Sequence, residues 1–442
     1  MLIEVHIIQN HAPSNLNRDD SGSPKTAIFG GYRRARISSQ CLKRCYRTSK
    51  TFRDEVGTLG MHTCAMPDEV IRRVLNNGID LTEDEQKKLK AALVKVLKKG
   101  EAGGGDSSDS DEAKETGSEE VEKAKAQKDK SRTAQSVFWR ECELNALADS
   151  VKTWAGGDKK QDFDPESALR PVGLNWAGIP VDMALFGRMV TSKLMHNVEA
   201  SSQFAHAIST HEFAREFDLW TRVDDRRDKR LDFYDALGAG EKLESGTDGM
   251  GDAEFTSACY YNYFNVDFCA LVDNLTGKAL KHDLDDSNDR EEAKRQGCNA
   301  VIGLLKAAIF ERPTGKFNSM ATPSLPSLVL VEVRDSHVPV SYADAFAKPV
   351  DPKNEETQSD TGQVQRVNLP EESARRLIKE ANRITKAFCR SARNRLLFTG
   401  GRDLGASLDP LDTAPVRPVD SVDDLVKELR TALECPQEKK DA

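Results

Sequence analysis

Segments with the pattern of β-strands place the strongest constraint on the fold of this chain. Met1–Gln9 is rich in aliphatic and β-branched residues, with Glu4 and His6 alternating against isoleucine and valine, which is typical of a mostly buried strand. The main elements follow in the order strand 1–9, helix 39–50, strand 178–190, strand 255–268, helix 288–309 and strand 327–334. This order predicts an α+β fold with ferredoxin-like, split βαβ topology.

The predicted helix at 39–50 lies in a basic stretch without acids. The 442-residue chain has a net charge of −8, yet nine Lys or Arg residues and no acid lie between Asp20 and Asp54. A local excess of positive charge in an acidic protein indicates a specific anionic partner, because the net charge provides no general attraction. Ser38 or Ser39 would cap the helix, whose N-terminus favours a phosphate. We therefore predict binding to a phosphate backbone; a charged helix face turned to water is the competing interpretation.

Composition excludes several other classes of protein. The N-terminal residues do not have the apolar h-region expected of a signal peptide, and no apolar run approaches membrane-spanning length. Its nine cysteines include no C-x-x-C pair, and its eight histidines have no metal-ligand spacing. We expect a cytoplasmic protein with reduced thiols, without a metal site, a cofactor or a membrane partner.

Two further regions depart from the pattern of a compact core. Glu101–Glu122 contains nine acids, one lysine and several glycines and serines, a composition that cannot bury enough apolar area to offset the entropy of ordering. We predict a disordered surface insertion at about 100–131. Its simplest interpretation is a loop insertion that the fold tolerates. Amphipathic patterns predict helices at 66–75, 82–99, 136–153, 370–397 and 422–433.

The second departure is the segment 211–254, where aromatic and basic residues are interleaved. Phe217, Trp220 and Phe233 alternate with several Arg and Lys residues in a stretch of low apolar content. This combination suits an element that stacks on bases and contacts a nucleic-acid backbone, for instance a long hairpin. An ordinary surface loop with Trp220 packed against the body is the alternative.

Several motifs carry a resemblance to a known family. They are N-R-D-D at 17–20, A-I-F-G-G at 27–31, R-R-x-R-I-S-S-Q at 33–40, V-D-x-A-L-x-G-R-M at 181–189, A-H-A-I-S-T-H at 205–211 and W-T-x-V-D-D at 220–225. Together they resemble the CasC-type backbone subunit of type I-E CRISPR Cascade complexes, in the Cas-seven family of the RAMP superfamily. The resemblance covers nearly the whole chain in order, and the departures lie in the acidic insertion and at 228–251.

The resemblance implies an α+β architecture with an RNA-recognition-like (ferredoxin-like) palm, a helical fingers region and a protruding hairpin thumb. The implied boundaries are palm at 1–53, fingers with the acidic insertion at 54–177, palm at 178–210, thumb at 211–254, and palm with C-terminal helices at 255–442.

The implied function is that of a non-catalytic ribonucleoprotein subunit in antiviral defence. In the family, copies of the subunit, typically in a hexameric filament, bind along a CRISPR guide RNA together with other Cascade subunits, and target DNA pairs with the guide. By position in the motifs, Ser38, Gln40, Lys43, Arg44 and Arg47 would contact guide phosphates. Met189 and Trp220 would pack at a kinked nucleotide. Further implied RNA contacts are Arg18 and Lys25, and Lys316 is a candidate from its position beside a glycine in a loop.

Two alternatives remain open. Related backbone subunits of type III complexes cut target RNA with an aspartate in the loop after the first strand, where this chain has Asp19 and Asp20. Two adjacent carboxylates could position a metal or a 2′-hydroxyl for metal-dependent cleavage. The second alternative is a single-stranded RNA-binding protein outside CRISPR systems, which would not need copies of itself.

Overall fold

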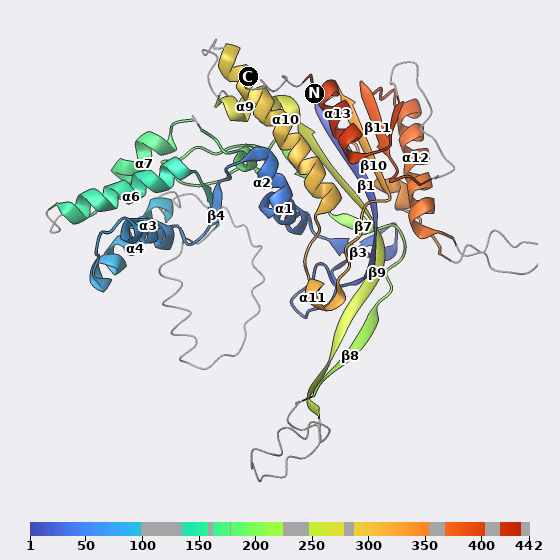
Figure 1. The fold of residues 1–442 in the computed structure, drawn as a ribbon, viewed down its shortest axis with the longest axis horizontal. Helices are drawn as coiled ribbons and strands as arrows, with labels where there is room; N and C mark the ends of the chain where they lie inside the picture. The colour runs from blue at the N-terminus through green and yellow to red at the C-terminus, as the bar shows by residue number, and fades with distance from the viewer. Residues whose placement is uncertain are drawn as a thin grey trace, which may run out of the picture.

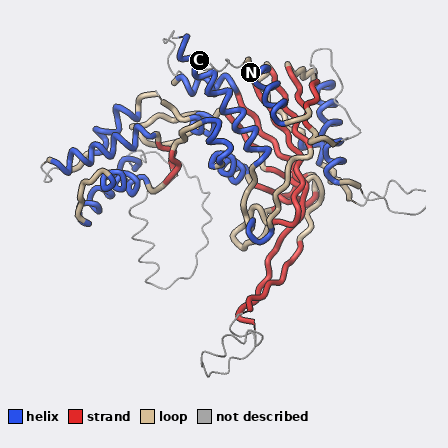
Figure 2. Tube along the Cα trace, viewed as in Figure 1, coloured by secondary structure: helices blue, strands red, loops and turns tan. Residues whose placement is uncertain are grey.

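A ten-stranded sheet forms the body of the protein (Figures 1 and 2). The computed structural model describes residues 1–98, 133, 136–157, 162–176, 178–223, 247–277, 287–352, 367–402 and 416–434. The strands of this sheet are β1 (Leu2–Ser14), β2 (Thr26–Phe29), β3 (Tyr32–Ile37), β6 (Ser202–Phe204), β7 (Ala207–Ser209), β8 (Glu216–Val223), β9 (Thr247–Asp267), β10 (Leu328–Arg334), β11 (Asn394–Phe398) and β12 (Val416–Val419). Their order is β12-β11-β10-β1-β9-β7-β3-β2, and β6 and β8 pair with β9.

Helices cover both faces of the sheet, and a separate helical group stands beside it (Figure 1). One face carries α1 (Ser39–Thr48), α2 (Lys50–Val56), α8 (Val181–Phe186), α9 (Phe268–Thr276), α10 (Ser287–Phe310) and α13 (Val422–Ala432). The other face carries α12 (Leu369–Ala387) and the 3-10 helix η3 (Ala343–Phe346), while the short α11 (Phe317–Met320) follows α10. The separate group contains α3 (Met66–Asn76), α4 (Glu83–Lys98), α6 (Glu141–Gly156) and α7 (Pro165–Gly173), with a small sheet of β4 (Met61–Thr63) and β5 (Val137–Trp139).

The order of the central strands interleaves two β-α-β connections. One runs from β1 through α1 and α2 to β7, and the other runs from β9 through α9 and α10 to β10. In the sheet β1 lies between β10 and β9, and β9 lies between β1 and β7, so each connection encloses a strand of the other. The pairing is antiparallel throughout these strands. The α+β class is therefore confirmed, and the interleaving is the arrangement that a split βαβ order describes.

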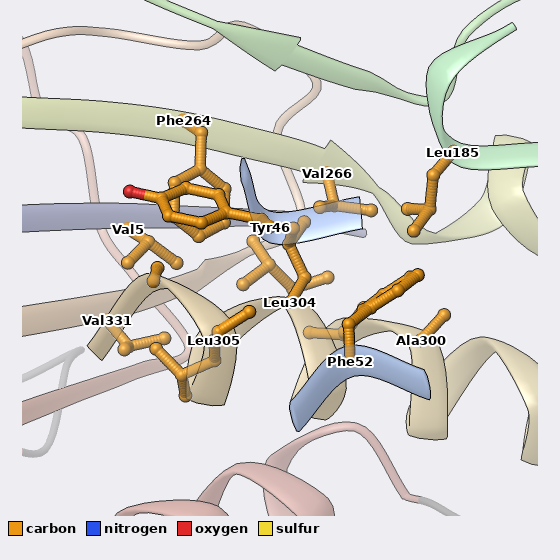
Figure 3. Close-up of a cluster of buried hydrophobic side chains, with 14 of the residues drawn as sticks. Val5, Tyr46, Phe52, Leu185, Phe264, Val266, Ala300, Leu304, Leu305 and Val331 are labelled. Carbon is orange, nitrogen blue, oxygen red and sulfur yellow. The ribbon is translucent and has the colours of Figure 1, made fainter. Parts of the chain in front are cut away.

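The core follows from the alternation of side chains along β1. Ile3, Val5 and Ile7 point to the face covered by α10, where the apolar cluster of Figure 3 includes Val5, Phe264, Leu304 and Val331. Successive side chains of a strand point to opposite faces, so Glu4, His6 and Ile8 face the side that α12 covers. Burial of one such aliphatic side chain stabilises the fold by about 1.5–3 kcal/mol.

Most predicted elements are confirmed, and three are wrong in part. The segment predicted as a strand at 178–190 contains α8, because a short and mostly apolar run fits a helix as well as a strand. The sheet positions expected there are taken by β6 and β7. The helix predicted at 370–397 ends at Ala387, and β11 begins at Asn394. The helix predicted at 136–153 begins only at Glu141, since Val137 and Phe138 belong to β5.

Other expectations have mixed outcomes. The expectation of reduced thiols is wrong for Cys298, which is disulfide-bonded. No helix in the described ranges has the length and apolarity that crossing a membrane requires. The acidic insertion at about 100–131 lies outside the described residues, and the predicted domain boundaries stay predictions.

A buried ion-pair group joins the helical group to the segment after α8. Glu143 on α6 is fully buried, and its carboxylate accepts hydrogen bonds from the guanidinium groups of Arg140 and Arg188 at 2.9 Å. Arg188 also donates to the carbonyl of His196 at 3.0 Å. The carboxylate thus holds two buried cations of different segments in place.

Replacing Glu143 by alanine removes the carboxylate that Arg140 and Arg188 share. We expect the variant to lose about 3–5 kcal/mol of unfolding free energy, because it leaves buried charge uncompensated. Glu141→Ala is the control, since Glu141 is mostly exposed in its pair with Arg73, and a loss below about 1 kcal/mol is expected there. Urea unfolding of the two variants measures both values, and equal losses would contradict the assignment.

Candidate nucleic-acid interface

A tight hairpin leads the chain into the basic helix α1. Gly30 and Gly31 connect β2 to β3 with φ angles of 61° and 83°, a left-handed conformation that favours glycine. A Cβ atom on Gly30 would lie 1.9 Å from the carbonyl oxygen of Ala347. The glycine pair therefore permits the hairpin turn and the close packing of Gly30 against Ala347. Strand β3 follows this turn and leads into α1.

The N-terminus of α1 is capped and has no acid in its first turn. The Ser38 hydroxyl accepts a hydrogen bond from the Cys41 N–H at 3.2 Å, as the sequence predicted for a capping serine. The Ser38 N–H donates to Oδ1 of Asn17 at 2.9 Å, and the Lys25 N–H donates to the Asn17 carbonyl at 2.9 Å. Asn17 therefore ties the loop after β1 to the start of the helix.

His206 also lies at this helix end. Its Nδ1 is 3.2 Å from the Ser39 N and 3.2 Å from Nη1 of Arg36. Desolvation, together with the charges of Arg36 and Lys25, lowers the pKa of His206, so the neutral ring accepts a hydrogen bond from the Ser39 N–H. The motif at 205–211 contains His206, but His206 is not among the residues that the sequence predicts to contact RNA. The contact could not be predicted from sequence, because 167 residues separate His206 from Ser39 in the chain. The presence of a histidine in the motif is the one sequence feature that points to it.

Several basic side chains around this helix end have no carboxylate partner. Lys43 is half-buried, with Nζ 5.6 Å from the centroid of the Phe204 ring, and burial lowers its pKa. Arg44 and Gln40 are exposed on the same helix. Within the described part of the chain, no Asp or Glu forms an ion pair with Lys25, Arg36, Lys43 or Arg44. Arg44 is the most accessible of these cations, while Arg36 also donates to the Thr26 carbonyl at 3.3 Å and Lys43 is half-buried.

Two other arginines of the basic stretch are used inside the fold. Arg47 forms an ion pair of 3.1 Å with Asp182, which is fully buried and also accepts hydrogen bonds from two backbone N–H groups. The Arg47 guanidinium lies 5.1 Å from the centroid of the Phe138 ring. Arg34 is buried and donates to backbone carbonyls of Ser209 and Phe346. The geometry of Arg47 does not favour its predicted contact with a phosphate.

The remaining predicted contacts fall into two groups. Arg18 is exposed in the loop that Asn17 anchors. Its backbone forms an isolated antiparallel β-bridge with that of Pro24. Lys316 has a φ of 49° at the start of α11, and the neighbouring Gly315 packs so closely on this loop that a Cβ would lie 2.4 Å from the Asn15 carbonyl oxygen. Arg18, Lys25, Ser38 and Lys316 therefore gather around residues 15–18.

Met189 and Trp220 belong to other parts of the molecule. Met189 follows the buried Arg188 and is 83% exposed. Trp220 lies on the β8–β9 hairpin, which protrudes far from the body (Figure 1). It is opposite Gly251 in the register, and its ring covers that glycine, since a Cβ there would lie 2.9 Å from the indole. The alternative of a surface loop with Trp220 packed on the body is therefore wrong, because Trp220 belongs to a paired strand of the hairpin. Phe233 lies outside the described residues.

The hairpin has two chemically different faces. Phe217, Leu219 and Met250 share one face with Asp252 and Glu254, and the three apolar side chains are each more than 60% exposed. Trp220 and Arg222 lie on the opposite face, which has glycines as cross-strand neighbours. The face of Trp220 and Arg222 also carries Glu216 and Asp218, so both faces of the hairpin have acidic side chains.

The two aspartates of the loop after β1 have different surroundings. One carboxylate oxygen of Asp19 accepts hydrogen bonds from the Ser21 hydroxyl at 2.7 Å, the Ser21 N–H at 3.0 Å and the Ser23 N–H at 3.0 Å. The Ser21 hydroxyl first, and then these amides, lower the pKa of Asp19. Asp20 is exposed. Among the described residues, no three His, Cys, Asp or Glu side chains are grouped to hold a metal ion.

The contrast between Arg47 and Arg44 gives a testable difference in stability. Exchanging Arg47 for glutamate places a like charge against the buried Asp182, and we expect a loss of about 3–5 kcal/mol in unfolding free energy. Arg44→Glu on the same helix changes an exposed side chain, and its effect is expected within about 0.5 kcal/mol. Urea unfolding measures both, and an unchanged stability of the Arg47 variant would show that the pair is not formed.

Comparisons with known proteins agree with the fold and give the family. A solved chain described as "CRISPR RNA-guided surveillance complex, pre-nicking" matches with a TM-score of 0.66 and 24% identity over 97% of this chain and 100% of that chain, which shows a shared fold. A second, described as "CRISPR RNA-guided surveillance complex", has a TM-score of 0.48 and 22% identity over 97% of this chain and 99% of that one. No curated protein matches. The family model described as CT1975-like protein matches residues 3–428, so the chain belongs to the family of CT1975-like proteins.

Proposed function

We propose that this chain is a non-catalytic backbone subunit of a Cascade-type CRISPR ribonucleoprotein and binds the guide RNA. Family membership and the shared fold with a chain of an RNA-guided surveillance complex support a Cas-seven-type subunit. The assignment to type I-E rests on the sequence motifs. A cytoplasmic location and a role in antiviral defence follow from this proposal.

The N-terminus of α1 is the observation that carries the proposal. The dipole of the helix favours a phosphate at this end, and the first turn has no acid that would oppose it. Ser38 and His206 already accept the Cys41 and Ser39 N–H groups, so the surrounding cations would supply most of the attraction. Lys25, Arg36, Lys43 and Arg44 surround this end without carboxylate partners in the described part of the chain. The site would neutralise successive phosphates of one strand.

These groups would hold RNA without reading its sequence. Backbone N–H groups, lysines and arginines recognise phosphate, whereas sequence is read at base edges. In a guide complex the sequence information belongs to base pairing with the target DNA, so a subunit that contacts only the backbone leaves the bases free. Trp220 on the protruding hairpin would stack on a displaced base, which contributes about 1–3 kcal/mol.

The proposal also includes further copies of the chain and other Cascade subunits as partners. A protruding hairpin that reaches beyond its own body suits a subunit that repeats along one RNA (Figure 1). The number of copies, typically hexameric in the family, follows from the resemblance alone. A monomer that binds RNA without self-association would instead favour a single-stranded RNA-binding protein outside CRISPR systems.

Changing the exposed cations of α1 tests the RNA site. We expect Lys43→Gln combined with Arg44→Glu to abolish retention of guide RNA in the purified complex, because Arg44 is exposed and neither group has a carboxylate partner among the described residues. Arg47 is left unchanged because its exchange would disturb the buried Asp182. The ratio of absorbance at 260 and 280 nm reports the RNA, and thermal unfolding confirms that the variant folds.

The control uses the same kind of charge change elsewhere. Lys379→Gln with Lys386→Glu on α12 alters the net charge by the same amount on the opposite side of the sheet. This variant is expected to retain RNA. A folded Lys43/Arg44 variant with an unchanged absorbance ratio would overturn the proposed site.

The non-catalytic assignment needs its own test, since a type III-like ribonuclease with Asp19 or Asp20 is the competing function. The Asp19 carboxylate already accepts three hydrogen bonds that shape its loop, which supports a structural role. We expect the assembled complex to leave complementary RNA intact in the presence of Mg²⁺. Fragments at a regular spacing that disappear in an Asp20→Ala variant would establish cleavage instead.

A further inference from the structure

The backbone of His206 is held in place by strand pairing on both sides. The residue lies between β6 and β7, and both of these strands pair with β9. Strand β7 also pairs with β3, where Ala207 is opposite Ile37, so His206 lies beside the point where β3 leads into α1. On the other side, the Ala205 N–H donates to the Tyr263 carbonyl at 3.0 Å. A histidine on such a framework has a defined position relative to the helix start.

The two contacts of the Nδ1 atom define where the ring carries its proton. The backbone nitrogen of Ser39 and Nη1 of Arg36 each lie 3.2 Å from Nδ1 of His206. A backbone N–H and a guanidinium group can only donate, so Nδ1 is the acceptor and carries no proton. The neutral ring therefore has its single proton on Nε2. Desolvation and the charges of Arg36 and Lys25 lower the pKa of His206, which agrees with a neutral ring.

The Nε2–H group is the remaining hydrogen-bond donor of this ring. In the part of the chain that the structure describes, the hydrogen bonds of His206 are made by Nδ1, and Nε2 has no partner there. His206 is exposed, so the donor can reach a group outside the chain. Because two groups of the fold orient Nδ1, the direction of Nε2–H is set before a ligand arrives, which lowers the entropic cost of binding.

We propose that the Nε2–H group of His206 donates a hydrogen bond to a phosphate oxygen of the guide RNA, as an uncharged contact beside Arg36 and Lys25. This rests on the proposed function, because it adds a residue to the same RNA site. A phosphate oxygen can only accept, and the two cations and the N-terminal end of α1 favour a negative acceptor here. The cations attract the backbone, whereas a donor of fixed direction positions it without reading the base sequence.

Two substitutions at one position separate the RNA contact from the contact within the protein. In His206→Asn the amide oxygen can replace Nδ1 as the acceptor for the Ser39 N–H, but no donor remains at the position of Nε2. In His206→Gln the amide nitrogen lies near the position of Nε2 and can still donate. We expect His206→Asn to weaken binding of a single-stranded RNA oligonucleotide to the full chain about tenfold, and His206→Gln less than about threefold. Fluorescence anisotropy of labelled RNA measures the affinities, and thermal unfolding shows that both variants fold.

The salt dependence of RNA binding tests whether the contact is uncharged. A neutral donor releases no counterion, so the slope of log affinity against log salt concentration in His206→Asn should equal that of the wild type. Arg44→Gln removes one charge and should reduce the slope by about 0.7. A similar reduction in His206→Asn would overturn the uncharged contact. His337→Asn is the matched control, because His337 is an exposed histidine that pairs with Asp267, and it should bind RNA as the wild type does.

The outcomes distinguish this inference from the proposed function. A folded His206→Asn variant with wild-type RNA affinity would overturn the inference and leave the RNA site of Lys43 and Arg44 in place. Equal losses in His206→Asn and His206→Gln would also overturn it, since the donor at Nε2 would then not matter. A wild-type chain that binds no RNA would overturn the proposed function and this contact together.

Discussion

The two-sided burial of β1 is the constraint on which the rest of the structure depends. Its even-numbered and odd-numbered side chains face different layers, with isoleucine and valine against α10 and with Glu4 and His6 on the side that α12 covers. The strand pairs with β9 and β10 along most of its length. A shift of one residue in register would bury the acidic face against an apolar layer, so the alternation specifies the sheet.

The same strand also positions the basic surface. It leads directly into the loop of residues 15–25, where the Asn17 side chain accepts a hydrogen bond from the Ser38 N–H at the start of α1. The loop carries Arg18 and Lys25, and α1 carries Lys43 and Arg44. Asn17 thus fixes the loop against the start of α1, through its side chain to Ser38 and its backbone carbonyl to Lys25.

The basic stretch divides its charges between two tasks. Arg34 and Arg47 point inward, where backbone carbonyls and the buried Asp182 satisfy them. Within the described residues, no Asp or Glu pairs with Lys25, Arg36, Lys43 or Arg44, although Arg36 donates to the Thr26 carbonyl at 3.3 Å. The inward arginines hold β3 and α1 in position, and the outward group gives the surface its charge. The protruding hairpin carries Trp220 and Arg222 on one face and the exposed Phe217, Leu219 and Met250 on the other.

The sequence by itself determined the α+β class, the first strand, the basic helix and its serine cap, because alternation, helical periodicity and capping are local properties. It could not distinguish α8 from a strand, since a run of six mostly apolar residues is too short for its periodicity to separate the two conformations. It also could not separate Lys43 from Arg47, which share a helix face four residues apart. Only the tertiary structure decided that Asp182 forms an ion pair with Arg47 and that His206 accepts a hydrogen bond from the Ser39 N–H. These partners are more than a hundred residues apart in the chain, so no local pattern relates them.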